Sequence, residues 1–127
     1  MDTRAKIKNL PELRPLLVRD AWVILAGEFD PLTAEAIELI EKTRIPGHRL
    51  LVVLRSNSDE LFSTDARAVL LAGLHSVDAV LVASREDWIV LTSQMGSVPI
   101  VEEAGGDRKR SEFEALVLAR QRTAAQA

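Results

Sequence analysis

Residues 22–36 read Trp-Val-Ile-Leu-Ala-Gly-Glu-Phe-Asp-Pro-Leu-Thr-Ala-Glu-Ala, an apolar run that stops at a glycine and continues as a helical pattern. The run from Trp22 to Ala26 predicts a strand that is buried on both faces of a sheet. Asp30 is a favourable N-cap, Pro31 suits the first helical position, and Glu35 places negative charge near the helix start. A strand, a glycine turn and a helix N-terminus in succession predict an anion-binding corner, because the first backbone N–H groups of a helix lack intrahelical partners.

Outside this stretch, apolar runs alternate with helical patterns. Further strands are expected at residues 50–54, 79–83 and 98–101, and further helices at 10–18, 64–74, 84–91 and 111–122. The alternation predicts a single doubly wound α/β domain with a mostly parallel sheet. This domain is expected to fill residues 1–127, with an N-terminal helical segment over 1–20 and a frayed tail over 124–127.

Three of the helices carry specific expectations. The helix over residues 10–18 is expected to cover one edge of the sheet. Thr64 or Asp65 can cap the helix that follows the second strand. The sheet-facing side of that helix is expected to consist of its small and apolar residues, namely Ala66, Val69, Leu70, Gly73 and Leu74. The stretch Ser84-Arg85-Glu86-Asp87 has the form of a capping box.

Composition excludes several classes of function. The 127 residues are 47% hydrophobic and 28% charged, as in ordinary globular domains, and no apolar run approaches the length of a membrane span, so a cytoplasmic protein is expected. A net charge of −3 and 4% aromatic residues argue against nucleic-acid and membrane binding. Without cysteine there is no thiolate chemistry, and His48 and His75 stand outside any motif, so no metal site is expected.

In doubly wound sheets, ligands bind at the carboxyl ends of the strands, where the strand order reverses. Residues 27–30, residues 57–59 and the loop after Val101 are therefore expected around one pocket. Arg67 could reach an anionic ligand there, and the alternative is a surface ion pair with Asp65. Trp22 and Trp88 are read as core or subunit-contact residues rather than as base-stacking residues.

The corner at residues 27–36 resembles the Gly-x-Phe-Asp-x-x-His-x-Gly-His signature of the cytidylyltransferase-like nucleotidyltransferases. Gly27, Phe29 and Asp30 match this signature in register. The two histidines contact the nucleotide phosphates in that family and stabilise charge at the α-phosphate. The positions of the first histidine, the glycine and the second histidine are occupied here by Thr33, Glu35 and Ala36. The resemblance therefore implies a Rossmann-like nucleotidyltransferase fold that lacks its catalytic residues.

Within that family the sequence is most similar to the adenylyltransferase domain of ADP-heptose synthases. The segments that carry this likeness are residues 8–13, 49–53, 67–74 and 77–80, the Asn-Ser-Asp at 57–59 and the Gly-Gly-Asp at 105–107. The resemblance implies a nucleotide site whose candidate residues are Gly27, Glu28, Phe29, Asp30, Thr33, Asn57, Asp59, Arg67, Gly105 and Gly106.

Three functions stay open at this point. The first is a degenerate, catalytically inactive domain that binds a partner subunit or, weakly, a nucleotide. The second is an active nucleotidyltransferase that joins ATP or CTP to a sugar or polyol phosphate with Mg²⁺. The third is a structural dimerisation module, and a homodimer is expected because related folds commonly pair.

Overall fold

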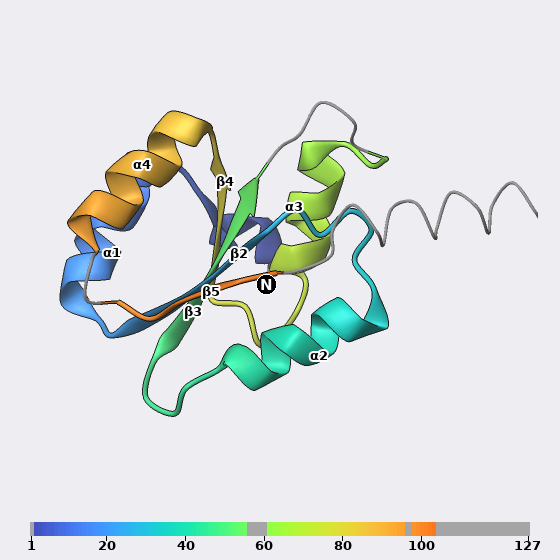
Figure 1. Ribbon diagram of the computed structural model, residues 1–127, viewed down its shortest axis with the longest axis horizontal. Helices are drawn as coiled ribbons and strands as arrows, with labels where there is room; N and C mark the ends of the chain where they lie inside the picture. Colours follow the sequence, from blue (N-terminus) through green and yellow to red (C-terminus); the bar gives the residue numbers. More distant parts are fainter. Residues whose placement is uncertain (1, 56–60, 96–97, 104–127) are drawn as a thin grey trace, which may run out of the picture.

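A computed structural model describes residues 2–55, 61–95 and 98–103 of the chain. Its centre is a sheet of five parallel strands in the order β1-β4-β3-β2-β5 (Figure 1). The strands are β1 (Ile7–Lys8), β2 (Trp22–Gly27), β3 (Arg49–Arg55), β4 (Ala79–Ala83) and β5 (Ile100–Glu102). The helices are the 3-10 helix η1 (Thr3–Lys6) and the α-helices α1 (Leu10–Arg19), α2 (Ala34–Thr43), α3 (Thr64–Ala72) and α4 (Arg85–Gln94).

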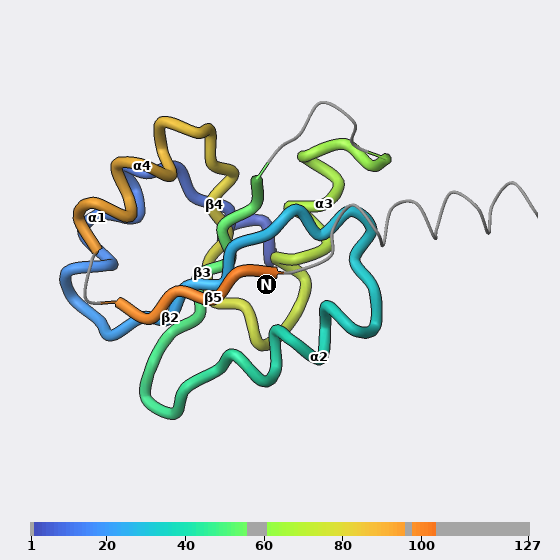
Figure 2. The backbone as a smooth tube through the Cα atoms, viewed as in Figure 1, coloured from blue at the N-terminus to red at the C-terminus, as the bar shows by residue number. Residues whose placement is uncertain are grey.

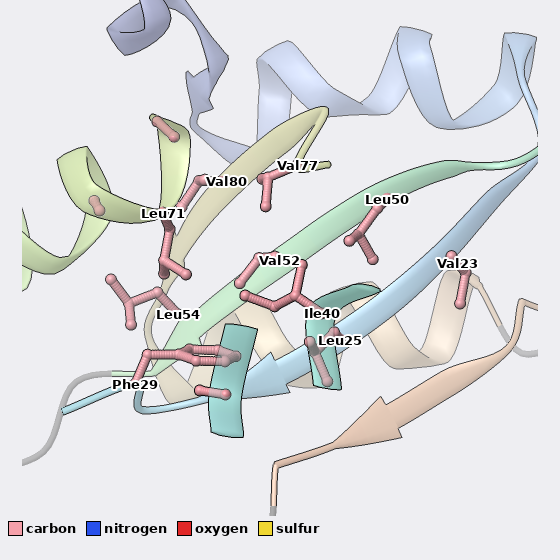
Figure 3. Packing of buried hydrophobic residues seen from close by; sticks show 13 residues of the cluster. Val23, Leu25, Phe29, Ile40, Leu50, Val52, Leu54, Leu71, Val77 and Val80 are labelled. Carbon is pink, nitrogen blue, oxygen red and sulfur yellow. The ribbon is translucent and has the colours of Figure 1, made fainter. Parts of the chain in front are cut away.

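The sheet is covered on both faces, which confirms the doubly wound, Rossmann-like α/β fold. Helices α2 and α3 pack on one face, and α1 and α4 pack on the other (Figures 1 and 2). Side chains of β2 alternate between the two cores, with Val23 and Leu25 on the α2 side and Ile24 on the α1 side. Figure 3 shows the core under α2 and α3, where Phe29 and Ile40 pack among the strand residues. The predicted burial of β2 on both faces is therefore confirmed.

Helix α1 begins at the expected place but lies elsewhere on the sheet. Asn9 and Glu12 form a capping box at its start, with each side chain accepting from the other residue's backbone N–H. Leu13 and Leu17 are buried against the sheet, so α1 covers a face and not the predicted edge. The edge is occupied by β1, which pairs with β4. Two residues are too few to show a hydrophobic period, so this strand was not predicted.

Helix α2 begins three residues later than predicted. Its N-cap is Thr33, whose hydroxyl accepts a 3.1 Å hydrogen bond from the N–H of Ala36. The predictions that Asp30 caps this helix and that Pro31 opens it are wrong. Pro31 follows a cis peptide bond in the preceding loop. Asp30 does not cap because its carboxylate accepts from backbone N–H groups of the next βα loop.

Helix α3 is rotated relative to the predicted orientation. Its N-cap is Ser63 rather than Thr64 or Asp65. The buried side consists of Arg67, Ala68, Leu71 and Ala72, and the predicted sheet-facing residues Ala66, Val69, Leu70 and Gly73 are exposed. Hydrophobic spacing fails here because the pattern assumes that an arginine points to solvent, whereas Arg67 is only 1% exposed.

The remaining elements follow the predictions closely. Ser84 and Asp87 form the predicted capping box at the start of α4. Strand β5 begins two residues later than expected, and the helix predicted over 111–122 and the tail at 124–127 lie outside the described residues. None of the helices in the described ranges is long and apolar enough to cross a membrane.

Candidate functional site

The carboxyl edge of the sheet is held together by the buried guanidinium of Arg67. Its Nη1 donates to the carbonyl of Glu28, after β2, at 2.6 Å and to that of Arg55, at the end of β3, at 3.5 Å. Its Nε donates to the carbonyl of Phe62 at 3.1 Å, and its Nη2 donates to Thr64 Oγ1 at 3.2 Å. A planar group with several donors in fixed directions can bridge loops that a lysine ammonium could not. Arg67 is 1% exposed, so the prediction of a surface ion pair with Asp65 is wrong, whereas the predicted ligand contact stays a prediction.

Asp30 makes a second connection between the same two loops. It is 3% exposed, and its two carboxylate oxygens accept from the N–H groups of Leu61 at 2.6 Å and Phe62 at 3.0 Å. The Phe62 peptide therefore lies between Asp30, which binds its N–H, and Arg67, which binds its carbonyl. The β2–α2 and β3–α3 loops are consequently fixed to each other by buried charged groups.

Gly27 marks the closest approach between the end of β2 and the chain that follows β5. A Cβ added at Gly27 would lie 2.7 Å from Glu103 Cβ, closer than real Cβ atoms approach, and 3.0 Å from the Phe29 ring. The N–H of Glu103 donates to the carbonyl of Ala26 at 2.8 Å, which holds the two segments in place. Phe29 itself is fully buried with a φ of 50°, a left-handed conformation that is costly outside glycine. The packing at this edge therefore accounts for both Gly27 and Phe29, which match the signature.

The positions of the signature's two histidines and of its glycine are occupied here by a capping, a buried and an exposed side chain. The hydroxyl of Thr33 caps α2, Ala36 is completely buried, and Glu35 is exposed in the first turn. Glu28 is half-buried on the preceding loop. No imidazole stands at this edge within residues 2–55, 61–95 and 98–103, since His48 lies in the α2–β3 turn and His75 follows α3.

A cation on the α4 side of the same edge was not predicted as a site residue. Arg55 ends β3, and its guanidinium lies 5.9 Å from the centre of the Trp88 ring, while its Nη1 lies 3.7 Å from Glu102 Oε1. Because β2 runs between β3 and β5, this ion pair passes over the carboxyl end of β2 beside Ala26, where the strand order reverses. The sequence feature that could have identified Arg55 is its position as a basic residue directly after an apolar run.

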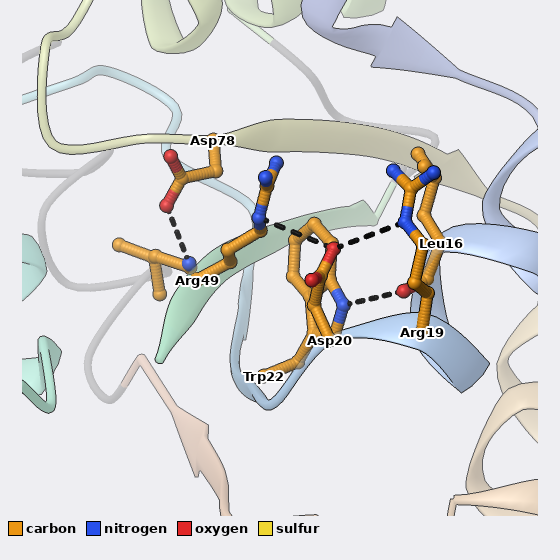
Figure 4. Close-up of polar contacts among 7 residues, drawn as sticks. Leu16, Arg19, Asp20, Trp22, Arg49 and Asp78 are labelled. Atoms are coloured by element: carbon orange, nitrogen blue, oxygen red, sulfur yellow. Dashed lines mark hydrogen bonds and ion pairs between the residues drawn. The ribbon is translucent and has the colours of Figure 1, made fainter. Parts of the chain in front are cut away.

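The same combination occurs at the amino end of β3. Arg49 lies 6.0 Å from the centre of the Trp22 ring, and its Nε lies 3.4 Å from Asp20 Oδ2, which also pairs with Arg19 (Figure 4). Trp22 is 3% exposed and donates its indole N–H to the carbonyl of Leu16. One strand thus presents two Arg–Trp–carboxylate clusters, one at each end of the sheet, and only the cluster of Arg55 lies where ligands bind in this fold.

Other predicted features lie away from this edge or beyond the described ranges. Asn57, Asp59, Gly105 and Gly106 fall outside the described residues. A cavity of about 380 Å³ lies in the α2–β3 turn, lined by Glu41, Arg44, Ile45, Pro46, Gly47 and His48, at the opposite end of β3. Among the residues that the structure describes, no group of three His, Asp or Glu side chains is arranged to hold a metal ion.

Comparison with known proteins adds no assignment to this geometry: no protein-family model matches the chain, and no curated protein matches it.

Proposed function

We propose that the chain is a nucleotidyltransferase-like domain without transferase chemistry that binds a nucleotide weakly at the carboxyl edge of its sheet. The observation that carries the proposal is the occupation of the three signature positions by Thr33, Glu35 and Ala36. The hydroxyl of Thr33 is used to cap α2, and Ala36 is buried. Each preorganised donor at a reacting phosphate contributes about 10²–10³ in rate, so the loss of two histidines removes most of the catalytic power.

Binding of an anion is supported by the groups that remain at this edge. The guanidinium of Arg55 is half-exposed, and its ion pair with the 59%-exposed carboxylate of Glu102 is loose enough to exchange for a phosphate. Arginine is well suited to phosphate because it can donate two parallel hydrogen bonds. Backbone N–H groups at the start of α2 add favourable partial charge.

Weak rather than tight binding follows from the carboxylates that surround the same place. Glu28 and Glu35 border the start of α2, and Glu102 and Glu103 follow one another at the end of β5. Like charges about 4 Å apart repel by roughly 4 kcal/mol at an intermediate dielectric, so a triphosphate approaches this edge at a cost. We therefore expect millimolar affinity, with Mg²⁺ entering only as the counterion of the nucleotide.

Fluorescence of the two tryptophans tests the site directly, because one tryptophan lies at each end of β3. In a Trp22→Phe background, Trp88 is the sole reporter, and titration with ATP, CTP or inorganic phosphate should quench it. Replacing Arg55 by Ala should weaken binding about tenfold, the effect of losing one charge-assisted hydrogen bond. The Glu102→Gln variant should bind more tightly, because it removes a carboxylate that competes with the phosphate for Arg55.

A matched control is available in the cluster at the other end of the strand. In the same Trp22→Phe background, Arg49→Ala removes an exposed arginine at the amino end of β3 and should leave the Trp88 titration unchanged. Equal effects of the two arginine variants, or no quenching at millimolar nucleotide, would exclude the proposed site. A flat response combined with concentration-dependent dimerisation in solution would instead support the structural module.

Turnover separates the proposal from the active alternative. Pyrophosphate release from ATP or CTP in the presence of Mg²⁺ and sugar or polyol phosphates should stay at the background rate. Release that depends on the protein and is lost in Thr33→Ala would establish a nucleotidyltransferase that uses the threonine hydroxyl in place of a histidine. In that case Thr33 would act on substrate in addition to capping α2.

A further inference from the structure

The outward side of α3 is apolar, unlike the outward sides of the other helices. Ala66, Val69, Leu70 and Gly73 form a row at helical spacing, which we call the α3 stripe, and Val69 and Leu70 are 38% and 55% exposed. Asp65 is the exposed charged residue of this helix, because Arg67 points inward. By contrast, α2 exposes Glu35, Glu38 and Glu41. A surface helix with so little charge on its outer side marks a contact surface.

We propose that the α3 stripe is the docking site of this chain's own C-terminal segment, residues 111–122. This inference does not depend on the proposed nucleotide site. In this segment Phe113, Leu116 and Val117 recur at spacings of three and four, which predicts an apolar helix face. The stripe has the same spacing in Ala66, Val69 and Leu70. Its small residues, Ala66 and Gly73, leave room for the large ring of Phe113.

The position at which the described chain ends makes this docking reachable. Glu103 leaves β5 at the carboxyl edge beside Gly27, and the next residue after Gly27, Glu28, is bonded to Arg67 of α3. Phe113 follows Glu103 by ten positions, which span up to about 33 Å when extended. Helix α3 has 9 residues and is therefore about 14 Å long, so the segment reaches any part of the stripe.

Charge at the end of the segment favours the same partner, while residues 111–122 as a whole are neutral because Glu112 and Glu114 balance Arg120 and Arg122. Residues 104–127 contain five basic and three acidic side chains, so the rest of the chain has a net charge of −5. The exposed acidic residues of α2 border this face, since α2 and α3 cover the same side of the sheet and Ser76, just after α3, donates a hydrogen bond to Glu41. Arg120 and Arg122 of a docked segment would meet this acidic border.

Disulfide trapping in the full chain tests the proposal cleanly, because the natural sequence contains no cysteine. The Leu70→Cys, Leu116→Cys double variant should oxidise to an intramolecular disulfide, seen as a mass loss of two hydrogens in a monomer. Two control pairs should stay reduced under the same conditions. Leu70→Cys with Ala115→Cys places the second thiol on the opposite side of the predicted helix. Ile89→Cys with Leu116→Cys places the first thiol on α4, on the other face of the sheet.

Each outcome decides the question. Preferential oxidation of the Leu70–Leu116 pair supports docking of the segment. A disulfide-linked dimer of the single Leu70→Cys variant shows that a second copy covers the stripe and overturns the proposal, as does equal oxidation of all pairs or oxidation of none. A thermal double-mutant cycle gives a second readout: Leu70→Asp and Leu116→Asp should lower Tm less than additively when combined. Ile89→Asp and Leu116→Asp should instead combine additively.

Discussion

Arg67 Nη1 lies 2.6 Å from the carbonyl oxygen of Glu28, so a side chain of α3 holds the loop that leads into α2. The two residues lie 39 positions apart in the chain. The same guanidinium bonds the carbonyls of Arg55 and Phe62. The carboxyl edge is therefore shaped by one buried cation, whose replacement should affect both loops together.

We predict that Arg67→Met destabilises the protein by about 3 kcal/mol or more, because several buried carbonyls lose their donor at about 1–3 kcal/mol each. Arg67→Lys should recover little of this loss, since an ammonium cannot reproduce the planar set of donors. Urea unfolding measures both values. Arg14→Ala, at an exposed position of α1, should change the free energy of unfolding by no more than about 0.5 kcal/mol. An Arg67→Met variant as stable as this control would contradict the structural role.

Asp30→Asn should cost about 1–3 kcal/mol, because the amide keeps one acceptor oxygen and turns an N–H₂ group toward a backbone donor. Hydrogen exchange of the Leu61 and Phe62 amides should accelerate in this variant, since both amides donate to Asp30. The control is Glu38→Gln, an exposed carboxylate-to-amide change on α2, which should leave stability and these two amides unchanged. Unchanged exchange in Asp30→Asn would show that the loops are held by other contacts.

Two glycines provide a matched pair for the close approach at the end of β2. Gly27→Ala should destabilise by about 1–3 kcal/mol, because the added methyl group meets Glu103 Cβ at 2.7 Å. Gly73→Ala should be neutral or stabilising by about 0.4–1 kcal/mol, since its φ is −70° and the nearest atom to the new Cβ is 3.4 Å away. Thermal melts of the two variants decide the matter. Similar Tm values would mean that β2 and the residue after β5 are not in close contact.

Phe29 combines complete burial with a positive φ, and these two properties are separable by substitution. Phe29→Ala should cost about 3–5 kcal/mol for the lost packing. Phe29→Gly should be as stable as Phe29→Ala or more so, because glycine adopts positive φ without the penalty of about 1 kcal/mol that other residues incur. At an ordinary buried position glycine is the less stable of the two. That ordinary order at residue 29, seen in denaturant titrations, would argue against the left-handed backbone.

Sequence patterns were sufficient for the layers of this fold because its three central strands, β2, β3 and β4, are buried on both faces. Uninterrupted apolar runs such as the one at 22–26 are hard to place anywhere except in the centre of a parallel sheet. Local capping chemistry was also readable where the partners are three residues apart, as in Ser84 with Asp87. Both signals depend on neighbours in the chain, which a sequence displays directly.

The site was predicted less well because its contacts join distant segments. Asp30 has the form of an N-cap, but its partners are Leu61 and Phe62, which no local pattern relates to it. Arg67 looked exposed because the free energy of burying a cation depends on carbonyls supplied by two other loops. With Arg67 pointing inward, α3 buries Ala68 and Leu71, and the predicted sheet-facing residues such as Leu70 are exposed.

The pairing of β1 with β4 has a consequence for how this chain assembles. Ile7 lies beside Val80, and Lys6 donates to the carbonyl of Leu74, so the earliest strand in the sequence finds its neighbour only after three later strands exist. During synthesis from the amino terminus, this strand must wait while most of the chain emerges. Closing so long a loop is slow compared with forming β2 beside β3. Strand β5 emerges later still and pairs with β2 across a loop of similar length, so both edge strands are expected to acquire protection after the centre of the sheet as the nascent protein folds.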